Sequence, residues 1–294
     1  MKTILRTFVG CTAILFGTAC MGAVKYVPEN MKVELSLKVP GNNAVNYKLH
    51  PDKLENSYFD YEWRSDNKLP ITVFHKVEER DSCMRLTVQL TAAQDVYFNY
   101  RQLLSTGYRH DNCQFYMPGF WYRRNLRSPK KAPSFHTSDS WLVREDRLSA
   151  PLTGIFSEKE KRFMTVNRLD DFSMDALATH KEGEIILSGK TSLGFTGFEN
   201  QQGIAMLSFG FPYREAPKSY IRKLTLAPEV EAFQLMKKGE SVLLTWEIME
   251  SGADDFSDFI QHTWEHCYDT YAPKPVENSY SIADMKQVLS CFFV

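Results

Sequence analysis

Cysteine is scarce in this chain, and no two cysteines stand in a C-x-x-C spacing. Six occur in 294 residues, and beyond Cys11 and Cys20 near the N-terminus they are scattered as Cys83, Cys113, Cys267 and Cys291. Without a C-x-x-C pair of cysteines, the sequence excludes a zinc ribbon and a thioredoxin-like redox site. These four cysteines could form disulfides after export, but a domain of this size does not need them, so isolated buried thiols are the favoured prediction.

An excess of charge of one sign is also lacking. The chain has 35 Lys and Arg against 36 Asp and Glu, and its net charge is −1. The basic residues are scattered, which excludes the electrostatic footprint of a nucleic-acid-binding protein. Aromatic residues, in contrast, make up 13% of the sequence. Such a chain can fill a large core and can also line a sugar-binding surface.

A second long apolar run is missing after the first two dozen residues. Those residues have a basic start with Lys2 and Arg6, followed by the short apolar run 8–16. That run is about half a membrane span, so residues 1–23 are predicted to be a signal peptide of an exported protein. Two alternatives stay open for its processing: acylation of Cys20 as a lipoprotein, or ordinary cleavage near Ala19 or Ala23.

Apolar and polar residues alternate over most of residues 24–250. This period of two, interrupted by turn residues such as those at 40–43 and 238–240, predicts a mainly β fold, a large β-sandwich or barrel, and not βαβ units. The predicted strands are 33–39, Ile71–Val77, Met84–Leu90, Val96–Tyr100, Arg162–Arg168, Glu184–Ser188, Ile204–Phe209, Ile221–Leu226 and Val242–Ile248.

The period changes to that of a helix after residue 250. Residues 251–275 predict a linker helix, with acidic residues in its first turns, prolines at its end and an inward stripe that includes Trp264 and Cys267. A second helix is predicted over 281–294, where Ser281 and Asp284 fit a capping box. Its apolar face must be buried, either against the sandwich or in a helical domain that continues from it. We favour the helical domain.

The residues 262–266 match the H-x-x-E-H spacing of inverted zinc proteases. His262 and His266 would hold zinc and Glu265 would activate water. A catalytic zinc ion needs a third protein ligand, and no histidine follows. We therefore predict no metal and no cofactor, and two ordinary histidines on the flank of a linker helix.

Three pairs of adjacent carboxylates occur at 145–146, 170–171 and 254–255. Glycoside hydrolysis needs two carboxyl groups that face each other across a sugar, and neighbouring residues of a strand point to opposite faces. None of the pairs is therefore a ready-made catalytic dyad, and we predict ordinary solvated acids. A G-x-S-x-G turn and a phosphate-binding loop are missing as well, which gives no support for a serine hydrolase or a nucleotide-binding protein.

The densest aromatic and basic cluster lies at residues 115–125 and runs into a long loop. Aromatic faces stack on sugar rings and arginine side chains bind carboxylates, so Trp121, Tyr122, Arg123 and Arg124 are candidate ligand-binding residues. The alternative is a loop packed by its own aromatics against a neighbouring domain. Packing is favoured, because aromatic clusters usually serve cores.

Three stretches of the chain resemble the N-terminal β-sandwich of six-hairpin glycosidase-like proteins. They are residues 115–125, 134–149 and 207–213, and the resemblance covers nearly all of the mature chain. These proteins are secreted or lipid-anchored enzymes of polysaccharide-degrading gut bacteria. The resemblance implies a β-supersandwich, a linker helix and then an α/α toroid that supplies the general acid and base. Glycans that contain uronic acids are the implied substrate class.

The chain departs from that plan because its toroid would begin near Ser281 and the sequence ends at Val294. No catalytic residue of the family can be carried over. The resemblance therefore implies a non-catalytic sandwich that supports a missing helical domain, with a glycan as ligand and the periplasm or outer-membrane surface of a Gram-negative bacterium as location. The alternative is a stand-alone surface lipoprotein that binds glycans.

Overall fold

The computed structural model describes residues 26–80, 83–125, 134–170, 183–219, 226–227, 229–273 and 281–291. The predicted signal peptide with Cys20, most of the predicted strand 221–226 and the apolar residues Phe292 and Phe293 lie outside these ranges. No helix in the described ranges is long and apolar enough to cross a membrane.

The described chain is mainly β, as predicted. The strands are β1 (Met31–Lys38), β2 (Val45–Lys53), β3 (Tyr61–Arg64), β4 (Ile71–Glu79), β5 (Cys83–Ala92), β6 (Val96–Arg109), β7 (Cys113–Met117), β8 (Trp121–Arg123), β9 (Ser140–Arg144), β10 (Leu152–Ser157), β11 (Arg162–Arg168), β12 (Gly183–Ile186), β13 (Phe195–Gln201), β14 (Ile204–Phe211), β15 (Arg214–Glu215), β16 (Lys218–Ser219), β17 (Leu226–Ala227), β18 (Val230–Met236) and β19 (Ser241–Gly252). Two α-helices follow, α1 (Phe256–Tyr271) and α2 (Ile282–Cys291), and three short 3-10 turns cover Pro28–Asn30, His110–Asn112 and Glu145–Arg147.

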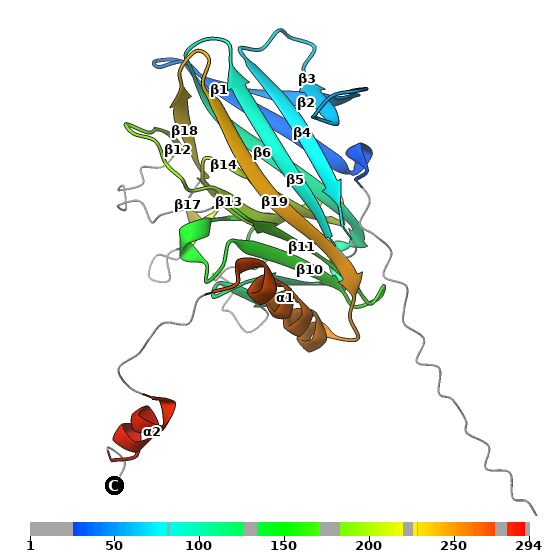
Figure 1. The fold of residues 1–294 in the computed structure, drawn as a ribbon, viewed down its shortest axis with the longest axis vertical. Helices are drawn as coiled ribbons and strands as arrows, with labels where there is room; N and C mark the ends of the chain where they lie inside the picture. The colour runs from blue at the N-terminus through cyan, green and yellow to red at the C-terminus, as the bar shows by residue number, and fades with distance from the viewer. Residues whose placement is uncertain are drawn as a thin grey trace, which may run out of the picture.

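The strands form two large antiparallel layers that share β2 (Figure 1). In one layer the order is β2-β1-β6-β14-β13-β9, and β18 also pairs with the start of β6. In the other layer the order is β2-β3-β4-β5-β19-β11-β10-β7-β8. A small parallel pairing of β12 with β18 extends the edge. Side chains from both layers meet in one continuous hydrophobic cluster, which makes this a β-sandwich.

Alternating burial explains why some strands could be predicted. In β5 every second side chain is buried, among them Leu86, Val88 and Leu90, each with no exposed surface. Strand β10 differs, because all six of its residues are buried. Its outer face lies under α1, so the polar positions that mark a half-exposed strand are missing, and alternation did not predict this strand.

Helix α1 covers β10, β11 and β7 at the lower end of the sandwich in Figure 1. The Asp255 side chain caps its start by accepting hydrogen bonds from the N–H groups of Ser257 (2.7 Å) and Asp258 (2.9 Å). Phe259 packs on the rings of Phe156 and Phe163. A methyl group added at Gly154 would lie 2.7 Å from the Phe259 ring, so glycine is required there for this close approach.

The prediction that the inward side of α1 carries Cys267 and Trp264 is confirmed for Cys267 and wrong for Trp264. Cys267 is buried, whereas Trp264 is 38% exposed at the edge of the helix. In α2 the predicted capping box is confirmed: the Ser281 N–H donates to Asp284 Oδ2 (2.9 Å), and the Asp284 N–H donates to Ser281 Oγ (3.1 Å). Residues 283–291 of α2 are all exposed.

Candidate functional site

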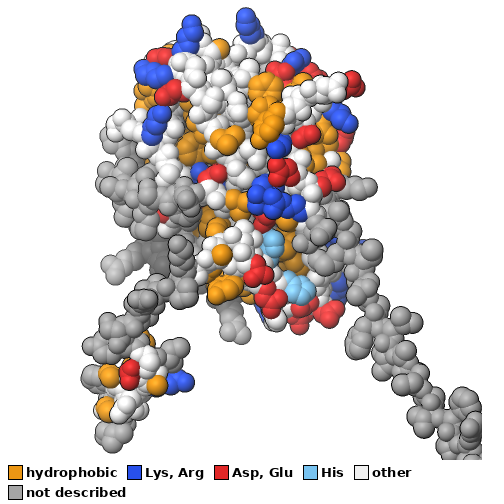
Figure 2. Space-filling model, in the orientation of Figure 1, with side chains coloured by type: hydrophobic (Ala, Val, Ile, Leu, Met, Phe, Trp, Pro, Cys, Tyr) orange, Lys and Arg blue, Asp and Glu red, His pale blue; other side chains and the backbone are white. Residues whose placement is uncertain are grey.

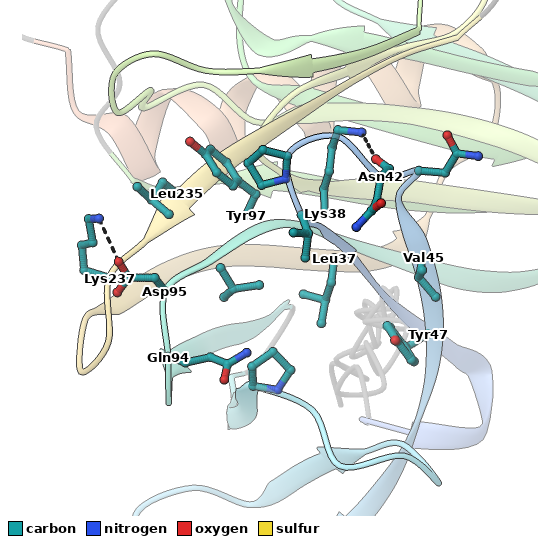
Figure 3. Close-up of a pocket in the computed structure, with 15 residues that line it drawn as sticks. Leu37, Lys38, Asn42, Val45, Tyr47, Gln94, Asp95, Tyr97, Leu235 and Lys237 are labelled. Carbon is teal, nitrogen blue, oxygen red and sulfur yellow. Dashed lines mark hydrogen bonds and ion pairs between the residues drawn. The ribbon is translucent and has the colours of Figure 1, made fainter.

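A pocket of about 540 Å³ opens at the end of the sandwich opposite α1 (Figure 3). Four connections of the chain contribute to its lining: those between β1 and β2, between β3 and β4, between β5 and β6, and between β18 and β19. Ligand pockets in proteins typically measure about 300–1,000 Å³. Its described lining residues are Leu37, Lys38, Val39, Pro40, Asn42, Asn43, Val45, Tyr47, Pro70, Gln94, Asp95, Val96, Tyr97, Leu235 and Lys237.

Aromatic rings and side-chain amides come together in this pocket. Tyr47 and Tyr97 are half-buried, while the amides of Asn43 and Gln94 are exposed. Among the described residues, none forms a hydrogen bond with either amide side chain, which leaves both to bind a ligand. Such a mixture of apolar surface with a few convergent polar groups is typical of a binding pocket.

An ion pair closes one side of the pocket. Lys237 Nζ lies 2.8 Å from Asp95 Oδ2, and the N–H of Lys238 donates to Asp95 Oδ1 at 2.9 Å (Figure 3). The hydrogen bond from Lys237, with that N–H, holds the pKa of Asp95 below its usual range. Asp95 is the single carboxylate among the described lining residues, so this pocket has no second acid for a hydrolytic dyad.

The four ligand-binding residues predicted at 121–124 have separate surroundings. Trp121 has no exposed surface and packs among Phe135, Trp141 and Phe198. Tyr122, on the opposite face of β8, is 51% exposed. Trp121 is therefore part of the core and cannot present its ring to an outside sugar.

The two arginines of this group also differ. Arg124 Nη1 donates to the backbone carbonyls of His110, Asp111 and Cys113 at 2.9–3.1 Å, which is a structural role in the turn before β7. Arg123 is exposed, and its guanidinium lies 5.3 Å from the ring centroid of Phe256 on α1. Ligand binding at residues 121–124 stays a prediction, in which Tyr122 and Arg123 are the accessible members.

Exposed aromatic side chains follow one edge of α1. We call Trp264, Tyr268 and Tyr271 the aromatic face; they are 38%, 65% and 40% exposed. With Ala150, Pro151 and Pro273 they line a shallow groove of about 320 Å³. Their polar atoms are largely engaged, since Trp264 Nε1 donates to Tyr116 Oη (2.7 Å) and Tyr271 Oη donates to the Arg168 carbonyl (2.8 Å).

The H-x-x-E-H residues do not converge on one point. His262 Nε2 lies 3.5 Å from Asp258 Oδ1, one turn earlier on the same helix. His266 Nε2 instead lies 2.6 Å from Oε1 of Glu247 on β19. Glu265 is exposed and accepts a hydrogen bond from Gln261 (2.8 Å). This arrangement differs from that of a zinc protease, in which both histidines bind the same ion.

The prediction of solvated acids is wrong for Glu145. Its side chain has no exposed surface and lies 2.6 Å from Arg168 Nη1, while the N–H of Gly194 donates to it at 2.8 Å. Arg168 is held in turn by Asp170 (3.0 Å). Burial raises the pKa of Glu145, against the attraction of Arg168. Glu145 and Arg168 therefore form a structural ion pair, which links β11 to the residue before β13.

The prediction of buried free thiols is confirmed for three of four cysteines. Cys83, Cys113 and Cys267 are free and buried, and Cys291 on α2 is exposed. Burial raises the pKa of the Cys113 and Cys267 thiols to about 12. Neither is therefore an activated nucleophile.

No protein-family model and no curated protein sequence matches the chain. Among solved structures, a polysaccharide lyase is similar over 80% of this chain and 27% of its own length, with 14% identity and a TM-score of 0.37. A protein from Synechocystis sp. PCC 6803 is similar over 74% and 73%, with 6% identity and a TM-score of 0.38. An α-galactosidase from Geobacillus stearothermophilus, solved with raffinose, is similar over 74% and 30%, with 10% identity and a TM-score of 0.32. The chain thus spans less than a third of the lyase and of the galactosidase, and likeness at this level does not establish a family.

Proposed function

We propose that this chain is a non-catalytic β-sandwich domain of a carbohydrate-active protein and that it binds an oligosaccharide in the pocket of Figure 3. The observation that carries the proposal is that two tyrosine rings and two side-chain amides, which have no hydrogen-bond partner among the described residues, line one pocket of suitable size. Sugar rings offer apolar faces that stack on aromatic rings, and hydroxyl groups that pair with amides.

The single, ion-paired carboxylate supports binding without hydrolysis. Both hydrolytic mechanisms of glycosidases use two carboxyl groups across the scissile bond, and Asp95 has no such counterpart among the described lining residues. Lys237 is already paired with Asp95. The pocket therefore favours neutral oligosaccharides over uronic acids, because no described basic side chain in it lacks an acidic neighbour.

Isothermal titration with neutral and uronic-acid-containing oligosaccharides tests this proposal. The variants Tyr47→Ala and Gln94→Ala should each weaken binding roughly three- to tenfold, as expected for a lost stacking or amide contact of about 0.5–1.5 kcal/mol. Tyr58→Ala is the matched control, because Tyr58 is 70% exposed and lies outside the pocket. The proposal fails if no oligosaccharide binds, or if Tyr122→Ala and Arg123→Ala abolish binding while the pocket variants do not.

The aromatic face of α1 favours a second candidate function, which is to support a helical domain that packs on this face. The groove on this face is lined mainly by carbon, and the side-chain polar atoms of Trp264 and Tyr271 are already bonded within the chain. Sugar hydroxyls would find few partners there, whereas apolar helices would bury it well. Met285, Val288 and Leu289 of α2 are also exposed, at 45%, 57% and 59%, and need a similar partner.

If this second function is right, the DNA that follows the codon for Val294 should encode pairs of antiparallel α-helices in one of its three reading frames. When the encoded helical segment is co-expressed with the chain, we expect the two to copurify. The double variant Trp264→Glu/Tyr268→Glu should lose that association, because charges would enter an apolar contact. Tyr58→Glu is the matched surface control. Equal copurification of the double variant, or DNA that encodes no helical hairpin, would count against this function.

A further inference from the structure

Three side chains with metal-binding atoms converge where α1 meets the sandwich. They are the thiol of Cys83, the carboxylate of Glu247 and the imidazole of His266, and their ligand atoms lie within 4.8 Å of one another. Cys83 and Glu247 are buried, and the His266 side chain is 24% exposed. Figure 2 shows histidine side chains at the surface over α1, next to acidic and basic groups. The cluster is therefore enclosed on the sheet side and reachable through the histidine.

Strand register places two of the three groups. In the pairing of β5 with β19, Cys83 lies opposite Met249 and Arg85 lies opposite Glu247. Cys83 and Glu247 are thus diagonal neighbours on one face of the sheet, the face that α1 covers. His266 comes from the third turn of α1, and its Nε2 lies 2.6 Å from Glu247 Oε1.

The donor set suits a zinc ion. Thiolate, imidazole and carboxylate are the three ligand types of Zn²⁺ in proteins, at about 2.0–2.3 Å. A tetrahedral ion at those distances holds its ligand atoms roughly 3.3–3.7 Å apart, which follows from the same bond lengths. The His266–Glu247 hydrogen bond would have to open by about 1 Å, within the reach of a side-chain rotation.

The neighbouring groups are compatible with a cation. Burial disfavours the Glu247 carboxylate most, but the hydrogen bonds from His266 and Cys83 together with the charges of His266 and Arg85 outweigh it and lower the pKa of Glu247. Arg85 Nη2 stands 3.9 Å from Glu247 Oε2 and competes for it, yet its side chain is 31% exposed and can turn to solvent. Thr270 Oγ1 donates to Glu247 Oε1 at 3.4 Å and orients it from outside the site.

We propose that Cys83, Glu247 and His266 bind one Zn²⁺ ion, with water as fourth ligand, and that the ion fastens α1 to β5 and β19. Binding replaces the thiol proton and breaks the histidine–glutamate hydrogen bond, so a proton is released. The proposal departs from the sequence expectation of no metal. It uses His266 without His262, which is turned to Asp258.

Titration of the metal-free full chain with zinc chloride tests the site, followed by metal analysis after desalting. One ion per chain is expected, together with a higher melting temperature. Both should be lost in Cys83→Ser and His266→Gln, whereas His262→Gln and Cys291→Ser should behave like the unchanged chain. His262 is the matched control because it lies one turn away on the same helix, and Cys291 controls for exposed thiols.

Cobalt(II) gives an independent readout, since a cobalt–thiolate bond produces a charge-transfer absorption in the near ultraviolet. This band should appear in the unchanged chain and in His262→Gln, and should be missing in Cys83→Ser. Circular dichroism of each variant shows whether it still folds. Absence of a tightly held ion in the unchanged chain, or binding that survives both Cys83→Ser and His266→Gln in folded protein, would overturn the proposal.

Discussion

Replacing Trp121 with alanine is expected to lower the free energy of unfolding by about 3–5 kcal/mol, the usual cost of removing a large buried aromatic side chain. The indole has no exposed surface and touches three rings at centroid distances of 5.0–5.5 Å. Its Nε1 also donates to the carbonyl of Arg123 in the same strand at 3.0 Å, so the indole N–H is paired. Unfolding in urea, followed by circular dichroism, measures the change.

Tyr122→Ala is the matched control for this prediction, because Tyr122 lies next to Trp121 on β8 but is 51% exposed. Its replacement should change the free energy of unfolding by less than about 1 kcal/mol. If the Trp121→Ala variant kept its stability but lost oligosaccharide binding, Trp121 would be a ligand-binding residue, as its sequence context suggested, and not a core residue.

Arg168→Met should also cost about 3–5 kcal/mol of unfolding free energy, because it leaves the carboxylate of Glu145 buried without its counter-charge. Glu145 has no exposed surface, and of the described groups that donate to its side chain, the N–H of Gly194 would remain. The loss should shrink at acidic pH, where the isolated carboxyl group is protonated and no longer penalises folding. Chemical unfolding at neutral and acidic pH measures both effects.

Two further variants make this second prediction specific. The double variant Glu145→Gln/Arg168→Met should be less destabilised than the sum of its single variants, because neither replacement leaves a buried charge behind. Arg162→Met removes an exposed pair on the same strand, in which Arg162 lies 2.9 Å from Glu250, and should cost less than about 1 kcal/mol. Equal losses in Arg168→Met and Arg162→Met would show that burial of the pair is not what matters.

Several of the predicted strands have one face in the core and one in water, although β11 and β14 were also predicted and are almost wholly buried. Strands β1, β4, β5 and β19 pass through such surroundings, and their alternating residues were recognised. Strand β13 is different: its first five residues are all buried, because it lies between β9 and β14 in the middle of a layer with its outer side covered. Its two phenylalanines, Phe195 and Phe198, are three residues apart and do not alternate with polar residues, so a period of two could not reveal it.

Candidate sites proved harder to predict than strands. Residues 121–124 were selected for residue type, but the pleat of β8 turns Trp121 inward and Tyr122 outward, and sequence context does not tell which residue takes which face. The lining of the Figure 3 pocket comes from four connections and the adjoining strand ends, which are far apart in sequence, so no local motif could have marked it. The one available signal was the turn at 40–43, whose polar residues now form one wall of the pocket.

The sequence by itself determined the mainly β character, the helix after residue 255 with its acidic cap, and the burial of most thiols, because each depends on local periodicity, capping or residue type. Tertiary structure alone decided that Glu145 is buried against Arg168, that Trp121 belongs to the core and that Cys83, Glu247 and His266 face one another. Those outcomes depend on strand register and on how α1 lies on the sheet. Both are set by the packing of residues far apart in the chain, which no short stretch of sequence specifies.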